Sequence, residues 1–107
     1  MPLDFVATEC GFDNGLGGAS NAAGTGPSHY VLFGRDGDGV YFEYDDQIHG
    51  GVDQVAHVVI HLDRIVFSLR DKDTITVRKE MSDTEWSEFI AGVRDAFPPA
   101  IVAGAAN

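Results

Sequence analysis

The clearest hydrophobic pattern is a pair of short apolar runs, residues 55–62 and 65–69, separated by Asp63-Arg64. Within each run, large apolar side chains recur at every second position, as they do on the buried face of a β-strand. A two-residue turn at Asp63-Arg64 would place apolar residues opposite one another in three cross-strand pairs: Leu62 with Ile65, Ile60 with Phe67, and Val58 with Leu69. The pattern therefore predicts an antiparallel hairpin with one buried face.

Four further segments alternate in the same way and are predicted to be strands: residues 3–10, 29–33, 40–44 and 74–79. Residues 11–28 differ, because they are rich in Gly, Ala, Ser and Asn and contain Leu16 as their one large aliphatic residue. Such a composition buries little apolar surface, so this segment is predicted to be a mobile loop.

One helix is predicted over residues 82–97. Ser82 and Glu85 have the spacing of a capping box, in which each side chain satisfies a backbone N–H at the start of the helix. Large apolar residues then recur at helical spacing: Trp86, Phe89, Ile90, Val93 and Phe97. Pro98-Pro99 ends the helix, and residues 98–107 are expected to form a loose tail.

Together these elements predict an α+β fold, a mainly antiparallel meander sheet of about six strands with the C-terminal helix packed on one face. Residues 1–107 are expected to form a single domain. The one cysteine, Cys10, cannot form an internal disulfide, and the first residues lack the basic start and apolar core of a signal peptide. No segment contains the ~20 apolar residues of a membrane span. We therefore expect a cytoplasmic protein of bacterial type.

Charge is unevenly distributed along the chain. The net charge of -10 comes from 17 acidic and 7 basic residues. Residues 1–63 hold ten acids and one base (net -9), whereas residues 64–107 hold seven acids and six bases (net -1). Nucleic acids and anionic membranes are excluded as expected partners, because phosphate binding needs clustered Lys and Arg. A basic protein partner is favoured, although solubility alone also explains an acidic chain.

The histidines and aspartates do not form a recognisable metal site. His57 and His61 lie four apart on a strand, about 13 Å from each other, too far to chelate one ion. Asp36 and Asp38 match only part of a calcium-binding loop, and a tight turn explains them better. No metal and no other cofactor is therefore expected.

Residues for catalysis are equally sparse. Glu43 and Asp45 share a strand face about 7 Å apart, a separation that suits paired carboxylates in acid–base chemistry. Exposed strand faces commonly carry such pairs, however, and no nucleophile motif accompanies this one. The chain is therefore predicted not to be an enzyme.

Residues 29–97 resemble the immunity protein 10 family of bacterial polymorphic toxin systems. The similarity lies in residues 30–35, residues 40–47, Gly50-Gly51 and the hairpin at 55–69. Its most specific part is an acidic strand followed by glutamine: Tyr41, Glu43, Asp45, Asp46 and Gln47. The resemblance implies a small cytosolic protein that binds and neutralises a cognate toxin.

Our hypothesis is that these five residues contribute to a surface that binds a basic toxin domain. Tyr is a frequent hot-spot residue in interfaces, while acids at the rim mainly affect the association rate. Two alternatives stay open. Residues 45–51 could simply form a turn, and the chain could be a small homo-oligomeric binding or assembly module that forms a homodimer through an exposed sheet edge.

Overall fold

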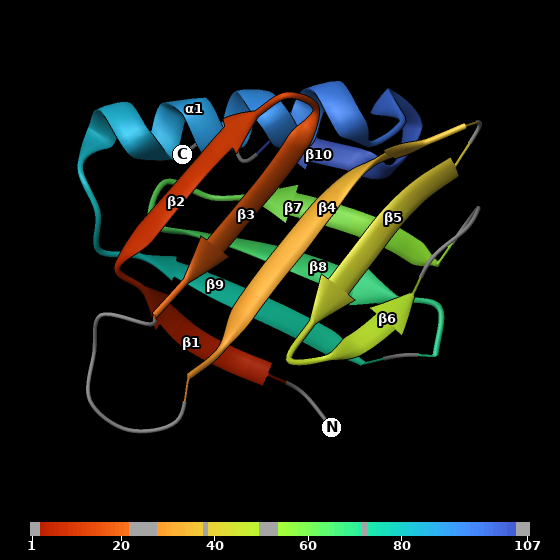
Figure 1. Cartoon of the computed structure of the whole chain (residues 1–107), viewed down its shortest axis with the longest axis horizontal. Coiled ribbons are helices and arrows are strands. Elements are labelled where there is room, and N and C mark those ends of the chain that lie inside the picture. The colour runs from red at the N-terminus through yellow and green to blue at the C-terminus, as the bar shows by residue number, and fades with distance from the viewer. Residues whose placement is uncertain (1–2, 22–27, 38, 50–53, 72, 105–107) are drawn as a thin grey trace.

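The computed structural model describes residues 3–21, 28–37, 39–49, 54–71 and 73–104. These residues form two five-stranded sheets that face each other, with one α-helix along one side (Figure 1). Sheet A has the strand order β1 (Leu3–Ala7), β9 (Thr74–Lys79), β8 (Arg64–Leu69), β7 (Val55–Ile60) and β10 (Val102–Gly104). Sheet B has the strand order β2 (Glu9–Asp13), β3 (Leu16–Ser20), β4 (Tyr30–Asp36), β5 (Gly39–Tyr44) and β6 (Gln47–His49).

The α+β class and the C-terminal helix are confirmed, but the single antiparallel meander of six strands is wrong. Sheet B is antiparallel, whereas sheet A is mixed, because β1 pairs in parallel with β9 and β10 pairs in parallel with β7. The predicted strand at residues 3–10 is divided at Thr8, where the chain passes from sheet A to sheet B. Alternation identifies a strand but not its partner, so the two sheets are not visible in the pattern.

The predicted loop at residues 11–28 is a second correction, because its first half contributes to β2 and β3. Asn14 and Gly15 have positive φ values of 53° and 81° and join the two strands in a two-residue turn. Such Asn-Gly turns match the twist of a hairpin. Gly17 is buried, and a Cβ there would lie less than 3.0 Å from the ring of Phe33. The small residues therefore allow close packing. Residues 22–27 lie outside the described part of the chain.

The C-terminal tail is also more regular than predicted. Residues 99–101 form a short 3-10 helix, and Val102 and Ala103 pair with Val58 and Val59 of β7. This parallel pairing extends sheet A by one strand beyond β7. The residues after 104 lie outside the described part of the chain.

The central hairpin is confirmed, but its turn lies one residue earlier than predicted. The chain reverses over Leu62-Asp63, and the His61 N–H donates to the Arg64 carbonyl at 2.8 Å. The cross-strand pairs are consequently Ile60 with Ile65 and Val58 with Phe67. Ile65 and Phe67 each pair with a β7 residue two positions earlier than predicted. Because side chains alternate with a period of two, all of these residues stay on the core face. Leu62 was predicted to face the core, yet it lies in the turn and is 69% exposed.

Helix α1 (Asp83–Ala96) begins after the predicted N-cap Ser82, whose hydroxyl accepts from the Glu85 N–H at 3.2 Å. The Glu85 carboxylate accepts from that hydroxyl at 3.1 Å. The helix packs mainly against β2 and β3, along the side of the two sheets rather than flat on one of them (Figure 1). At Gly92 a Cβ would collide with the ring of Phe12. Glycine therefore lets the helix approach β2 closely.

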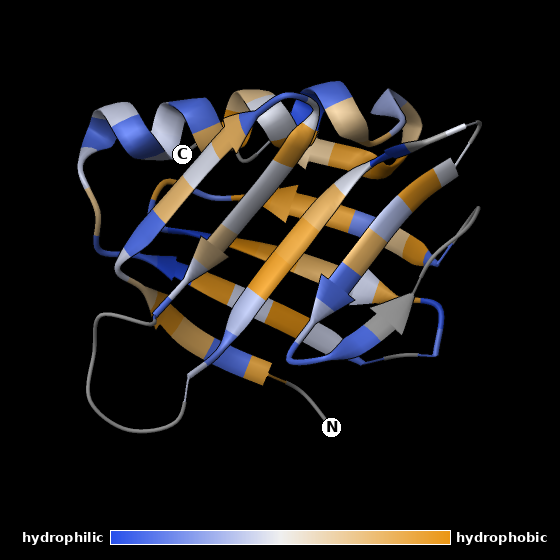
Figure 2. Cartoon of the chain, viewed as in Figure 1, coloured by the Kyte–Doolittle hydropathy of each residue, from blue (hydrophilic) through white to orange (hydrophobic). Residues whose placement is uncertain are grey.

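The core lies between the sheets and is rich in phenylalanine. Phe42 and Phe67 have ring centroids 5.1 Å apart, and Phe33 and Phe97 are 5.3 Å apart. Phe89 of the helix joins them, at 5.8 Å from Phe33. Burying each of these side chains stabilises the fold by about 1.5–3 kcal/mol. Apolar residues fill the middle of β4 and alternate with more polar residues along β9, while the turns are largely polar (Figure 2). The core thus fixes the two sheets and leaves their outer faces for other contacts.

Candidate interaction surface

The outer face of sheet B is strongly acidic and is not covered by any described element (Figure 1). The strand register shows which side chains share it, because directly paired residues lie on the same side of a sheet. We call this surface the acidic face. It consists of outward residues of β2 to β5 and the two residues of the β5–β6 turn: Glu9, Asp13, Leu16, Ser20, Tyr30, Leu32, Tyr41, Glu43, Asp45 and Asp46.

Glu43 is the centre of a tyrosine cluster on this face. The hydroxyls of Tyr30 and Tyr41 each donate a hydrogen bond to a different oxygen of the Glu43 carboxylate. These bonds favour the charged carboxylate, so the pKa of Glu43 is lowered. The same bonds raise the pKa of Tyr41 and raise that of Tyr30 to about 12. At neutral pH the cluster is therefore one fixed negative charge held by two protonated tyrosines.

Asp45 and Asp46 form the tight turn between β5 and β6. Tyr44 pairs with Gln47 across them, and their φ values of 46° and 66° are both in the left-handed region. This is the backbone pattern of a type I′ hairpin turn, for which Asn and Gly are the usual residues. The Asp46 N–H donates to the Tyr30 hydroxyl at 3.0 Å, and that hydroxyl lies 3.1 Å from Asp46 Oδ1. The turn is thereby attached to the tyrosine cluster.

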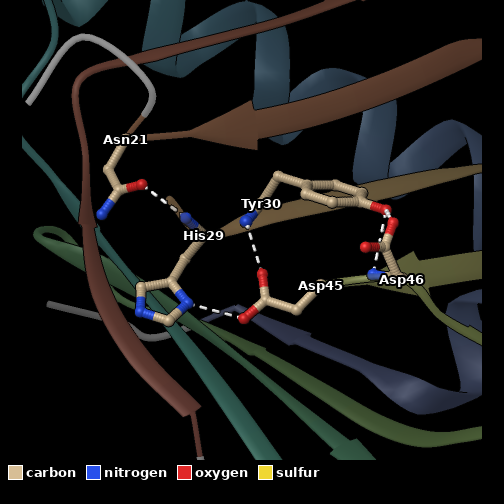
Figure 3. A network of polar contacts seen from close by, with 5 residues as sticks. All are labelled: Asn21, His29, Tyr30, Asp45 and Asp46. Carbon is tan, nitrogen blue, oxygen red and sulfur yellow. Dashed lines mark hydrogen bonds and ion pairs between the residues drawn. The ribbon is translucent and has the colours of Figure 1, made fainter. Parts of the chain in front are cut away.

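Asp45 connects the turn to the start of β4 (Figure 3). One oxygen accepts a hydrogen bond from the Tyr30 N–H at 2.9 Å, and the other lies 2.6 Å from His29 Nδ1. The His29 N–H in turn donates to Asn21 Oδ1 at 2.6 Å. The interpretation of residues 45–51 as a turn thus holds for Asp45 and Asp46 but is wrong for residues 47–49, which form strand β6. Residues 50 and 51 lie outside the described part of the chain.

The five predicted binding residues differ in their exposure and in their position on the sheet. Tyr41 and Glu43 are half-buried on the acidic face, and Asp46 is exposed at its end. Asp45 is directed toward His29, and Gln47 is exposed in the edge strand β6. No local pattern marked His29 or Asn21 as neighbours of this site, because their contacts join residues far apart in sequence. Tyr30 was visible only as part of the predicted strand at residues 29–33 and of the segment 30–35 that carries the family resemblance.

Sheet A carries a different charge pattern on its outer face. Arg78 makes a two-point contact with Asp4, with both N–O distances at 2.9 Å, and Arg64 lies 2.9 Å from Asp63. His57 lies on the same face. The uneven charge along the sequence therefore becomes a difference between two faces of the molecule. Acids gather on the outer face of sheet B, whereas Arg78 and Arg64 pair with acids on sheet A.

Among the described residues, no three His, Cys, Asp or Glu side chains lie close enough together to bind one metal ion. The partial calcium motif cannot be placed, since Asp38 and the side chain of Asp36 lie outside what the structure describes. Glu43 uses both carboxylate oxygens to accept tyrosine hydroxyls. The arrangement is suited to presenting charge and aromatic surface to another molecule.

Fold and site together define a two-sheet α+β protein with an open acidic sheet face. No protein-family model matches the chain, and neither curated proteins nor solved structures provide a match. Within the described residues, the helices are too short or too polar to span a bilayer.

Proposed function

We propose that the chain is a non-enzymatic immunity protein that neutralises a basic bacterial toxin domain by binding it through the acidic face. The observation that carries this proposal is the Glu43 cluster, in which a charged carboxylate is held between two tyrosines on a sheet face that no described element covers. A negative field of this kind accelerates encounter with a positive partner.

The rigidity of the face supports binding as well. Tyr30 and Tyr41 are already ordered by their hydrogen bonds to Glu43, so little side-chain entropy is lost when a partner covers them. Tyrosines of this kind are frequent hot spots, because they combine a large apolar ring with a polar end. Affinity would then come from the tyrosines, and a fast association rate from the surrounding acids.

The resemblance to immunity proteins points to the same surface. Residues 40–47, its most specific part, form β5 and the turn that bounds the acidic face. A basic toxin, such as a nuclease with a phosphate-binding groove, would be blocked if acidic side chains occupied the place of its substrate phosphates.

Co-expression with a candidate toxin domain, sought first in the genes adjacent to this one, tests the proposal. Cells that produce the toxin domain should survive when this chain is present, and the two proteins should purify as a complex. Glu43→Lys should abolish protection, whereas Asp95→Lys, an equal charge change near the C-terminal end of α1, should leave it intact. Toxicity that persists with the wild-type chain would refute the function.

Self-association is the second candidate, and the edge strand β6 favours it. Within the described residues β6 pairs with β5 alone, so its other edge is open to a strand of another chain. Sedimentation equilibrium distinguishes the two functions. A dimer that dissociates when Ile48 is replaced by Pro would support assembly, whereas a monomer at all concentrations would exclude it.

A further inference from the structure

A hollow of about 520 Å³ lies on the acidic face, where β2, β3 and β4 run side by side. Its floor contains two glycines, Gly11 and Gly18, which are directly paired across β2 and β3. Gly18 is in turn paired with Leu32 of β4. The absence of two side chains in this row leaves space beside Leu32 and Tyr30, which also line the hollow.

The rim of the hollow is negatively charged. Glu9 and Glu85 line it, and Ser20 donates a hydrogen bond to Glu9 at 3.0 Å. Cys10 also lines it, and the pKa of its thiol is raised to about 12 by burial and then by Glu85 and Glu88. The described lining residues include no Lys or Arg that would neutralise these acids. The hollow therefore combines a small apolar floor with a negative rim.

We propose that this hollow receives one arginine or lysine side chain of the partner protein. The aliphatic part would lie along Gly11 and Leu32, and the cationic end would meet Glu9 and Glu85. Long cationic side chains have this division between an apolar stem and a charged head. The inference rests on the proposed function, since it names the chemistry of the partner that covers the acidic face.

The position of the hollow favours a protein side chain over a free small molecule. It is open to solvent, whereas small-ligand pockets bury most of the ligand surface. Tyr30 lines the hollow and also holds Glu43, so the hollow is continuous with the tyrosine cluster. A partner that covers the cluster would thus carry the cationic side chain into the hollow.

Gly11 allows a direct test, because a Cβ built there meets no atom within 4 Å. Gly11→Leu should fill the hollow without straining the backbone, and it should weaken binding of the toxin domain about tenfold. Gly11→Ala is the matched control and should bind almost as the wild type does. Circular dichroism and thermal unfolding confirm that both variants fold. Unchanged toxin binding by folded Gly11→Leu would overturn the inference.

Two substitutions test the role of the negative charge at the rim and leave the hollow open. Glu85→Gln keeps an acceptor for the Ser82 hydroxyl, and Glu9→Gln keeps an acceptor for Ser20. The double variant should weaken toxin binding and lower its salt dependence. Equal binding by the double variant and the wild type would count against a cationic occupant.

A probe that does not need the toxin separates this inference from the proposed function. N-acetyl-arginine methylamide, titrated into ¹⁵N-labelled protein, should shift the Gly11 and Gly18 amide signals, and the uncharged norleucine analogue should not. The shifts should disappear in Gly11→Leu. Shifts spread evenly over the acidic face would overturn the inference. If the wild-type chain fails to bind the toxin, the immunity function fails, while this titration still decides whether the hollow takes a cationic side chain.

Discussion

The hydroxyl of Tyr30 on β4 donates a hydrogen bond to the Glu43 carboxylate on β5, and the same hydroxyl accepts one from the Asp46 N–H at 3.0 Å. One tyrosine therefore joins the acidic strand to the turn that ends it. Tyr41 completes the cluster by donating to the other carboxylate oxygen. These two donors lower the pKa of Glu43.

We predict that Tyr30→Phe raises the pKa of Glu43 toward its ordinary value of 4.5, because a donor to the charged carboxylate is removed. Carboxyl ¹³C chemical shifts followed through an acid titration measure this change. Tyr41→Phe should act in the same direction, and Tyr44→Phe, which leaves both donors in place, is the control. An unchanged Glu43 titration in both of the first two variants would contradict the role of these hydrogen bonds.

The same lowered pKa has a consequence for stability. Glu43 releases its proton more readily in the folded than in the unfolded chain, so the contribution is fully present above pH 4.5 and is lost as pH falls through the folded-state pKa. In the Glu43→Gln variant, the free energy of unfolding should therefore fall less steeply as the pH is lowered. Urea denaturation at a series of acidic pH values provides the measurement.

Cys10 is predicted to react slowly with alkylating reagents. Burial, with a smaller contribution from Glu85 and Glu88, raises the pKa of the thiol from 9.0 to about 12, so little thiolate exists at neutral pH. Labelling by iodoacetamide should accelerate when urea unfolds the chain. The double variant Glu85→Gln with Glu88→Gln should label somewhat faster in the folded state. Equal rates for folded and unfolded wild-type protein would refute this protection.

The glycine-rich segment provides a test of packing. A Cβ at Gly17 would lie less than 3.0 Å from the ring of Phe33, so Gly17→Ala should lower the free energy of unfolding by about 1–3 kcal/mol. Gly11→Ala on the neighbouring strand meets no atom and should be neutral or slightly stabilising. Chemical denaturation of the two variants compares the same substitution in a packed and an open position.

This segment also shows where prediction from the sequence is limited. Its composition suggested mobility, but Gly17 has no side chain because the ring of Phe33 occupies the space beside it. The Asn14-Gly15 pair was a local hairpin signal, although few large apolar residues flank it. Helix α1 was predictable because its cap and apolar stripe are both local. The parallel pairing of β1 with β9 joins distant segments and leaves no local trace.

The candidate site was predictable only as a set of residue types on one strand. Alternation placed Tyr41 and Glu43 on one face, as the register confirms. Asp45 was expected beside Glu43, but positive φ values rotate the turn so that Asp45 meets His29. The contact between Tyr30 and Glu43 follows from the pairing of β4 with β5, which an alternating pattern does not specify.

The final prediction separates the structural role of Asp46 from the role in toxin binding that we propose for it. Asp46→Asn keeps the shape of the side chain and suits the left-handed backbone at φ 66°, so the free energy of unfolding should change by less than about 0.5 kcal/mol. Removing the charge should nevertheless slow association with the toxin domain and flatten its salt dependence. Asp95→Asn, on α1, is the matched control and should leave the association rate near that of the wild type. Stopped-flow measurements at several salt concentrations provide the comparison. If the two variants associate equally fast, Asp46 belongs to the turn alone and the binding surface must be redrawn around Tyr30, Tyr41 and Glu43.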